Sequence, residues 1–232
     1  MLLLSGAKLG KIALTGCTML LSVVVYAWIF GWKYALGFVV LLFVHELGHY
    51  LAAKVRGLAV GAPTFIPFVG AWVQLKDLPH DAETDAWVGL AGPLLGTAGA
   101  LVCYLLARSW NLDWLLAVAY AGLFLNLFNL IPLMPFDGGR VTAVLSPRLW
   151  LLGVPVLGAL FLWRPSPMLL LMALLAAPHL WQAIRGPKDA AYYAVSAAKK
   201  WEYGLMYVAL AAFLAVMTHD VHEMLVARGI RG

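Results

Sequence analysis

The feature that most constrains the fold is a long apolar run from Tyr34 to Ala53. About 20 apolar residues in a helix match the hydrocarbon thickness of a bilayer, so the run predicts a membrane-spanning helix. Its only acidic or basic side chains are His45, Glu46 and His49. An ionisable side chain in hydrocarbon costs roughly 2.5–3.5 kcal/mol on insertion scales, so this cluster indicates a functional site.

The spacing of these polar residues predicts a metal site. In a helix, His45 and His49 are four residues apart, so both imidazoles project from one face. Glu46 lies about 100° round the helix from His45, within reach of a water held by the pair. The arrangement is H-E-x-x-H, which offers two nitrogen ligands for zinc and a carboxylate placed as general base. The alternative is two polar core histidines beside an isolated glutamate.

The composition predicts an integral membrane protein of one domain, residues 1–232. Hydrophobic residues make up 63% of the chain and charged ones 12%, against roughly a quarter charged in soluble proteins. The mean hydropathy is +0.87. The net charge of +5 does not indicate nucleic acid as a partner, because the lysines and arginines stand singly in short loops, where membrane topology explains them.

We predict an all-α polytopic membrane protein with six or seven transmembrane helices, at 13–31, 33–55, 86–107, 114–134, 149–163, 167–185 and, as the optional seventh, 201–218. Tryptophans and tyrosines near many of these ends are typical of an aromatic belt. With the N-terminus in the cytoplasm, most of the 16 lysines and arginines lie on the cytoplasmic side, as the positive-inside rule requires. The site would then open toward the cytoplasm, and we expect a prokaryotic cell membrane.

The segment 62–75 fits neither a span nor an ordinary loop. It is apolar, rich in β-formers and broken by Pro63, Pro67 and Gly70. We predict a β-hairpin or re-entrant loop that dips into the membrane, because irregular backbone at that depth needs protein or water to satisfy it. The alternative is a surface flap. The acidic stretch that follows, 77–85, is predicted to be a solvated linker.

The third span carries a face of small residues, Gly89, Gly92, Gly96 and Gly99. Glycines at this spacing let two membrane helices approach closely. We therefore expect helix packing there rather than a catalytic role.

A catalytic zinc site needs a third protein ligand. Asp137 is the best placed candidate, because Pro132 and Pro135 break the fourth span and Gly138-Gly139 permit backbone that other residues could not adopt. A carboxylate on such a broken segment can turn inward to a metal. Alternatively, Asp137 only caps a helix that starts at Gly138. The other acidic and histidine candidates are Asp77, His80, Asp81, His179 and Glu202.

Two segments together resemble the site-2 protease family of intramembrane zinc metalloproteases. They are His45–His49 and the stretch Asn129-x-x-Pro132-x-x-x-Phe136-Asp137-Gly138-Gly139. The resemblance covers about 33–148, with variable helices at 149–232. Two positions depart from the usual pattern: Phe136 replaces a leucine, and Gly96 stands where an asparagine is common.

The resemblance implies hydrolysis of a peptide bond inside the membrane. His45, His49 and Asp137 would bind one catalytic zinc ion, and Glu46 would act as general base. The substrate would be a transmembrane protein, such as a membrane-anchored regulator or a signal-peptide remnant. The chain resembles a minimal, core-only member of the family.

The resemblance also implies how a substrate is held. Asn129 would hold the substrate backbone in the cleft. The hairpin, with Phe65, Pro67 and Gly70, would pair with the unwound substrate as an added strand.

Two rival functions remain open. One is a different membrane metalloprotease with a glutamate as third ligand, for which the downstream glutamates offer no second intramembrane motif. The other is a scaffold or transporter with a structural or transported metal. A structural zinc site is normally closed by four protein ligands, whereas the sequence offers three convincing ones.

Overall fold

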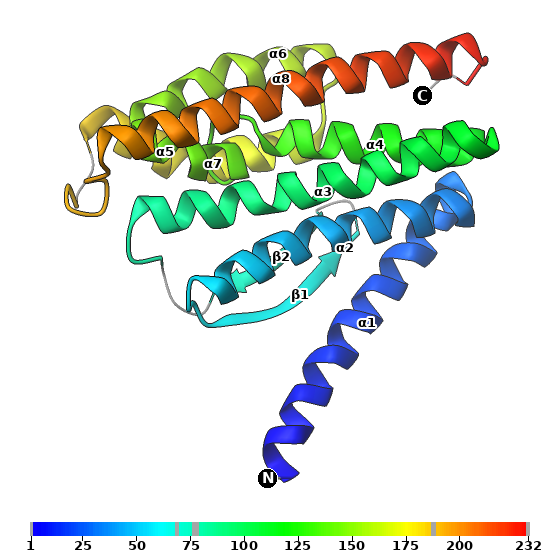
Figure 1. Ribbon diagram of the computed structural model, residues 1–232, viewed down its shortest axis with the longest axis horizontal. Coiled ribbons are helices and arrows are strands. Elements are labelled where there is room, and N and C mark those ends of the chain that lie inside the picture. The colour runs from blue at the N-terminus through cyan, green and yellow to red at the C-terminus, as the bar shows by residue number, and fades with distance from the viewer. Residues whose placement is uncertain (1, 68–69, 76–78, 187–188, 231–232) are drawn as a thin grey trace.

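The computed structural model is a bundle of helices with one small hairpin (Figure 1). It describes residues 2–67, 70–75, 79–186 and 189–230. The elements in chain order are α1 (Leu2–Phe30), α2 (Trp32–Val55), β1 (Val60–Ile66), β2 (Gly70–Leu75), α3 (Ala82–Trp110), α4 (Asp113–Asn129), α5 (Asp137–Leu145), the 3-10 helix η1 (Pro147–Leu152), α6 (Gly153–Trp163), α7 (Pro167–Arg185) and α8 (Ala197–Ala227).

Within the described residues, five helices, α1, α2, α3, α7 and α8, are long and apolar enough to cross a membrane. The chain is therefore an integral membrane protein. The apolar helices at 113–129 and 147–163 are shorter, so the predicted count of six or seven spans is not confirmed. The fourth predicted span, 114–134, was too long: α4 ends at Asn129, because Pro132 and Pro135 cannot continue a helix.

The helices α2, α3 and α4 form the centre of the bundle, with α8 packed across α4 and α5. In Figure 1, α8 runs along the side of the bundle opposite the hairpin, and α1 splays away from the other helices toward the N-terminus. The buried core between α3, α4 and α8 includes Leu90, Leu116, Leu123 and Leu214. This core holds α4 against α3 and so places the C-terminal end of α4 beside the middle of α2.

The predicted hairpin is present as antiparallel β1 and β2, with Phe65 opposite Ala71 and Pro63 opposite Val73. The edge of β1 that faces away from β2 is covered by α1. Thr15 Oγ1 donates to the carbonyl of Pro63 at 2.7 Å, and the amide of Phe65 donates to Thr18 Oγ1 at 3.3 Å. Both edges of β1 are therefore hydrogen-bonded within the chain, one to β2 and the other to α1.

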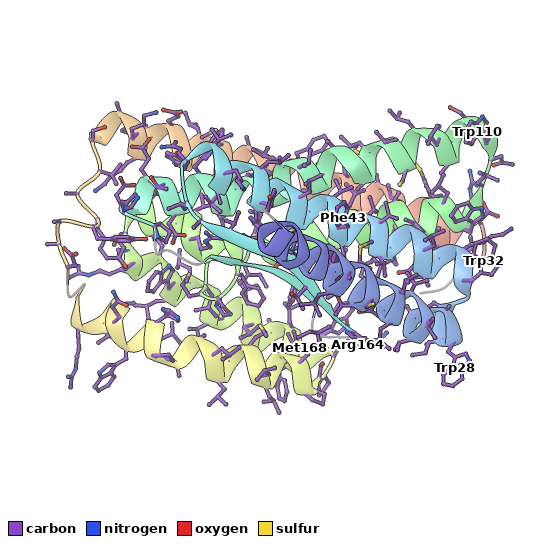
Figure 2. All side chains as sticks on the ribbon, turned by 90° about the horizontal axis from the view of Figure 1, so that it is seen from below. Trp28, Trp32, Phe43, Trp110, Arg164 and Met168 are labelled. Atoms are coloured by element: carbon purple, nitrogen blue, oxygen red, sulfur yellow. The ribbon has the colours of Figure 1, made fainter. Side chains whose placement is uncertain are left out.

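Tryptophans gather at one end of the bundle (Figure 2). Trp28, Trp32 and Trp110 are 93%, 64% and 65% exposed and lie near the turns that join α1 to α2 and α3 to α4. At the opposite end, the ion pairs Arg56–Glu83 and Lys199–Glu83 connect α2, α3 and α8. Exposed aromatics at the helix ends agree with the aromatic belt that we predicted.

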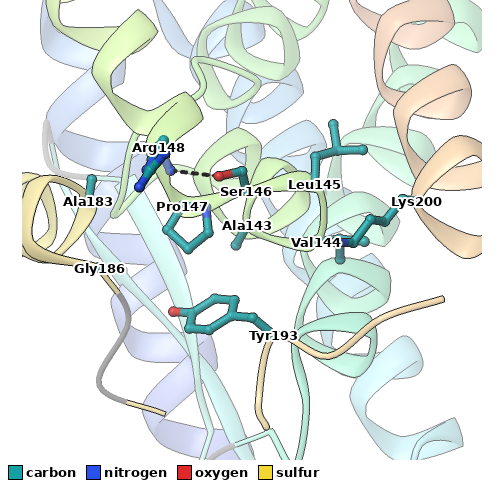
Figure 3. A pocket seen from close by; sticks show the side chains of 10 residues that line it. All are labelled: Ala143, Val144, Leu145, Ser146, Pro147, Arg148, Ala183, Gly186, Tyr193 and Lys200. Atoms are coloured by element: carbon teal, nitrogen blue, oxygen red, sulfur yellow. Dashed lines mark hydrogen bonds between the residues drawn. The ribbon is translucent and has the colours of Figure 1, made fainter. Parts of the chain in front are cut away.

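A cavity of about 260 Å³ lies among the ends of α5 and α7 and the start of α8. Its lining includes Ser146, Arg148, Tyr193 and Lys200 (Figure 3). None of the residues predicted to bind metal lines this cavity, so it is separate from the site described next.

Candidate metal centre

The two histidines of α2 lie side by side in the interior. His45 and His49 are 3% and 7% exposed, and their Nε2 atoms are 3.1 Å apart. They lie ten and six residues, respectively, before the end of α2 at Val55, which is about 15 and 9 Å along the axis at 1.5 Å per residue. Glu46, next to His45, is also buried, at 4% exposed.

Asp137 reaches these histidines from α5. After α4 ends, the chain turns through residues 130–136, and Asp137 is the first residue of α5. Gly138 and Gly139 allow this tight return: a Cβ on Gly138 would lie 2.2 Å from the carbonyl oxygen of Leu130, and one on Gly139 would lie 2.5 Å from backbone atoms of the 130–136 turn. The N-cap is Phe136, without a side-chain hydrogen bond. Asp137 therefore faces the histidines rather than capping a helix.

The three side chains have the geometry of a metal site. Asp137 Oδ2 lies 3.2 Å from Nε2 of His45 and 3.2 Å from Nε2 of His49. In a tetrahedral site with bonds of about 2.0–2.1 Å, two ligand atoms are about 3.3 Å apart. The triangle of 3.1, 3.2 and 3.2 Å therefore fits a zinc ion with room for a fourth ligand.

The outer nitrogens of both rings are also engaged. His49 Nδ1 donates to the carbonyl of Val88 at 2.7 Å, and His45 Nδ1 contacts Asn126 Oδ1 at 2.8 Å. A carbonyl oxygen only accepts, so each Nδ1 carries a hydrogen. In the neutral form of the ring, which is the form that binds a metal, Nε2 then presents its lone pair toward Asp137.

A buried ion pair between Arg140 and Asp85 lies next to Asp137. Arg140 donates to Asp85 Oδ1 through Nε at 2.8 Å and forms an ion pair with the same oxygen through Nη2 at 2.7 Å, and its Nη1 lies 3.9 Å from Asp137 Oδ1. Burial, followed by the charge of Asp85, raises the pKa of Tyr192 in the adjacent loop. The prediction that 77–85 is a solvated linker is thus wrong from Asp81 onward: Asp81 caps α3 by accepting from the Thr84 amide, and Asp85 lies within α3.

The glycine face of α3 packs as predicted. A Cβ on Gly92 would lie 2.3 Å from Nε2 of His49, and a Cβ on Gly48 would lie 2.3 Å from the carbonyl oxygen of Ala91. Only glycine permits α2 and α3 to approach this closely, since any side chain there would displace the imidazole or the neighbouring backbone.

The other candidate ligands lie elsewhere. His80 and Asp81 are exposed before α3, the His179 ring meets Trp150 edge-on, and Glu202 pairs with Lys199. Asp77 lies outside the described residues. Among those that are described, His45, His49 and Asp137 are the group of three able to hold a metal.

The residues predicted to hold substrate have mixed surroundings. Asn129 is partly buried, and its amide donates to the Leu125 carbonyl at 3.1 Å. The Phe65 side chain is 2% exposed and packs against Phe43, so it belongs to the core. Pro67 follows β1, and Gly70 begins β2 opposite Ile66.

The sequence reasoning missed Asn126, Val88 and Asp85. Asn126 had a usable signal, because it is one of the few polar residues in a mostly apolar helix and buried polar groups are costly unless they are hydrogen-bonded. The carbonyl of Val88 had no such signal, since every residue carries a main-chain carbonyl.

Fold and site together define a polytopic helical membrane protein with a buried centre of two histidines and one aspartate. Comparison with known proteins is more specific. The model of Peptidase family M50 matches residues 33–112, the region that holds both histidines and Glu46. This match agrees with the resemblance to the site-2 protease family that the two sequence motifs carry.

Several curated relatives match the chain. A zinc metalloprotease of Methanocaldococcus jannaschii is 32% identical over 47% of this chain and 34% of its own length. A putative zinc metalloprotease of Synechocystis is 36% identical over 49% of this chain and 31% of its own length. A probable chloroplastic zinc metalloprotease of Arabidopsis thaliana is 27% identical over 46% of this chain and 28% of its own length. The chain thus spans about a third of the length of these relatives.

One solved structure is also similar. It is the site-2 protease from Methanocaldococcus jannaschii, which is 21% identical, with 78% of this chain and 89% of that chain covered and a TM-score of 0.47.

Proposed function

We propose that this protein is an intramembrane zinc metalloprotease, which hydrolyses a peptide bond in or near a transmembrane segment of another membrane protein. The observation that carries the proposal is the convergence of His45, His49 and Asp137 within 3.2 Å of one another, with Glu46 buried beside them. The names of the relatives, all zinc metalloproteases, support zinc as the metal.

Each residue has a role in this proposal. His45, His49 and Asp137 hold the metal through Nε2, Nε2 and Oδ2. A zinc ion bound there supplies Lewis acidity toward a peptide carbonyl and toward water. Glu46 takes the proton of the attacking water and delivers it to the leaving amide. The surrounding helices keep the site apart from bulk solvent, which strengthens each electrostatic contact within it.

The hairpin is the proposed docking surface for the substrate backbone. A transmembrane substrate hides its peptide bonds in a helix, so it must unwind before cleavage, and an extended segment can then add to a strand edge. Because α1 bonds to the outer edge of β1, the edge that remains is that of β2. We propose that a membrane-anchored regulator or a signal-peptide remnant binds there, with Asn129 near the cut, and that the site opens toward the cytoplasm of a prokaryotic cell.

The test of this function is the substitution Glu46→Gln, assayed with a membrane-embedded substrate in detergent or vesicles. Cleavage should fall by at least about a hundredfold, the scale of lost general-base catalysis, while zinc per protein stays at the wild-type value. The exposed residue Glu223 on α8 provides the matched control, Glu223→Gln, which should retain cleavage. Full activity of Glu46→Gln would exclude Glu46 as the base. A scaffold or transporter would not depend on this carboxylate.

A further inference from the structure

Asn126 lies on α4 and contacts one of the two histidines from outside the metal site. Its side chain is 1% exposed. Its Oδ1 lies 2.8 Å from His45 Nδ1, and its Nδ2 donates to the carbonyl of Gly122 at 2.7 Å. Both ends of the amide are therefore used inside the bundle.

These two contacts determine which end of the amide faces the imidazole. The carbonyl of Gly122 only accepts hydrogen bonds, so the NH2 group of Asn126 must face it. The Oδ1 atom then faces His45, and since that oxygen only accepts, Nδ1 of His45 carries the hydrogen. In the neutral form of the ring, which is the form that binds a metal, Nε2 then presents its lone pair toward Asp137 and His49.

A glycine on α3 provides the space for this amide. A Cβ on Gly96 would lie 2.3 Å from Asn126 Oδ1 and 2.8 Å from Nδ2. Three helices thus cooperate at one point: α2 supplies the ring, α4 supplies the acceptor, and α3 leaves the volume that the acceptor fills.

We propose that Asn126 is a positioning residue that holds His45 in the tautomer and ring orientation required for metal binding. The inference rests on the proposed metal site. The matching partner of His49 is the main-chain carbonyl of Val88, which no side-chain substitution removes. Asn126 is therefore the partner that can be tested by mutation, and loss of such an outer hydrogen bond typically costs about 10–100-fold in metal affinity.

The test compares three variants of the full chain in detergent by competition for zinc with a chromophoric chelator. Asn126→Leu keeps the approximate volume but removes the acceptor, so zinc should bind about 10–100-fold more weakly. Asn126→Asp keeps an acceptor oxygen and should stay within a few-fold of the wild type. The control is Gln182→Leu, since Gln182 also carries a side-chain amide that donates within the fold, to Tyr193 Oη at 3.3 Å, and lies on α7, which packs on η1 and α6. Its zinc affinity should be unchanged.

A second readout needs no metal. In protein labelled with ¹⁵N-histidine and free of metal, NMR should show His45 in the Nδ1–H form for the wild type and Asn126→Asp, and a mixture of tautomers for Asn126→Leu. Wild-type affinity and an unchanged tautomer in Asn126→Leu would overturn the proposal, as would an equal loss of affinity in Asn126→Asp. If the wild type binds no zinc, the proposed function fails, and the NMR comparison still decides the role of Asn126.

Discussion

At the level of single residues, the centre depends on three side chains that are each held by a different neighbour. His45 is held by Asn126, His49 by the Val88 carbonyl, and Asp137 lies against Arg140. Such outer contacts restrict the rotation of ligands before a metal arrives, which lowers the entropic cost of binding.

The first prediction concerns Asp137. The substitution Asp137→Asn replaces an anionic oxygen ligand by a neutral amide, so zinc should bind substoichiometrically while the protein remains folded. Elemental analysis of zinc per purified protein measures this. Asp113→Asn is the control, because Asp113 pairs with Arg228, away from the site. Unchanged zinc content in Asp137→Asn would mean that another residue supplies the third ligand.

At the level of elements, the site depends on how closely α2 and α3 approach. Gly92 contacts the His49 ring and Gly48 contacts the α3 backbone, so the glycine face serves the metal site through packing alone. The hairpin depends on α1 in a similar way, since Thr15 and Thr18 occupy one edge of β1.

The second prediction tests the helix contact. In Gly92→Ala the new methyl group would lie 2.3 Å from His49 Nε2, and overpacking of this kind costs about 1–3 kcal/mol. We expect the imidazole to be displaced and zinc affinity to fall by about tenfold or more, measured by chelator competition. Gly158→Ala, where no atom lies within 4 Å, should bind zinc as the wild type does. Equal affinities would show that His49 does not need this space.

The third prediction tests the outer edge of β2. In an antiparallel pair, two opposed residues turn their amides either toward each other or both away from each other. The amide of Phe65 points away from β2, toward Thr18. The amide of its partner Ala71, and that of Val73 opposite Pro63, therefore point toward the outer edge of β2. Val73→Pro removes one outward donor without removing a hairpin hydrogen bond. Cleavage of a membrane-embedded substrate should show a raised KM with normal zinc content. Trp72→Pro, which removes an inward donor, should instead disrupt the hairpin. A KM unaffected by Val73→Pro would place the substrate elsewhere.

At the level of the whole molecule, the proposed metal site joins the two halves of the bundle. Two ligands come from α2, near the N-terminal elements, and the third from α5, which packs against α3 and α8. The ion pairs of Glu83 with Arg56 and Lys199 connect the same helices at the nearby end of the bundle. A bound ion should therefore stabilise the global fold and not only the site.

The fourth prediction follows from this connection. A ligand that binds only the folded state stabilises it by about 2.7 kcal/mol at a hundred times its dissociation constant. Removal of zinc by a chelator should lower the apparent Tm of the detergent-solubilised protein, and added zinc should restore it. Asp137→Asn should show little response to either treatment. A wild-type Tm that is independent of zinc would contradict a metal that bridges α2 and α5.

The features that depend on local geometry could be predicted from the sequence. The spacing of His45 and His49 places two rings on one helical face wherever that helix lies, and the prolines and glycines around Asp137 break α4 and permit the tight return. The β-formers, prolines and glycine of 62–75 likewise predicted a β-hairpin or a re-entrant loop, and the structure has the hairpin. These conclusions needed only helix periodicity and backbone preference, which are encoded within a few residues.

Which residues contact these local features could be read only from the tertiary structure. Asn126 reaches His45 across 81 positions of sequence, and Arg140 reaches Asp85 across 55. Thr15 and Thr18 cover β1 from a helix whose direction no local pattern specifies. The physical reason is that such contacts depend on the angles and separations at which helices pack, and these follow from the summed fit of all side chains and glycine gaps in the bundle.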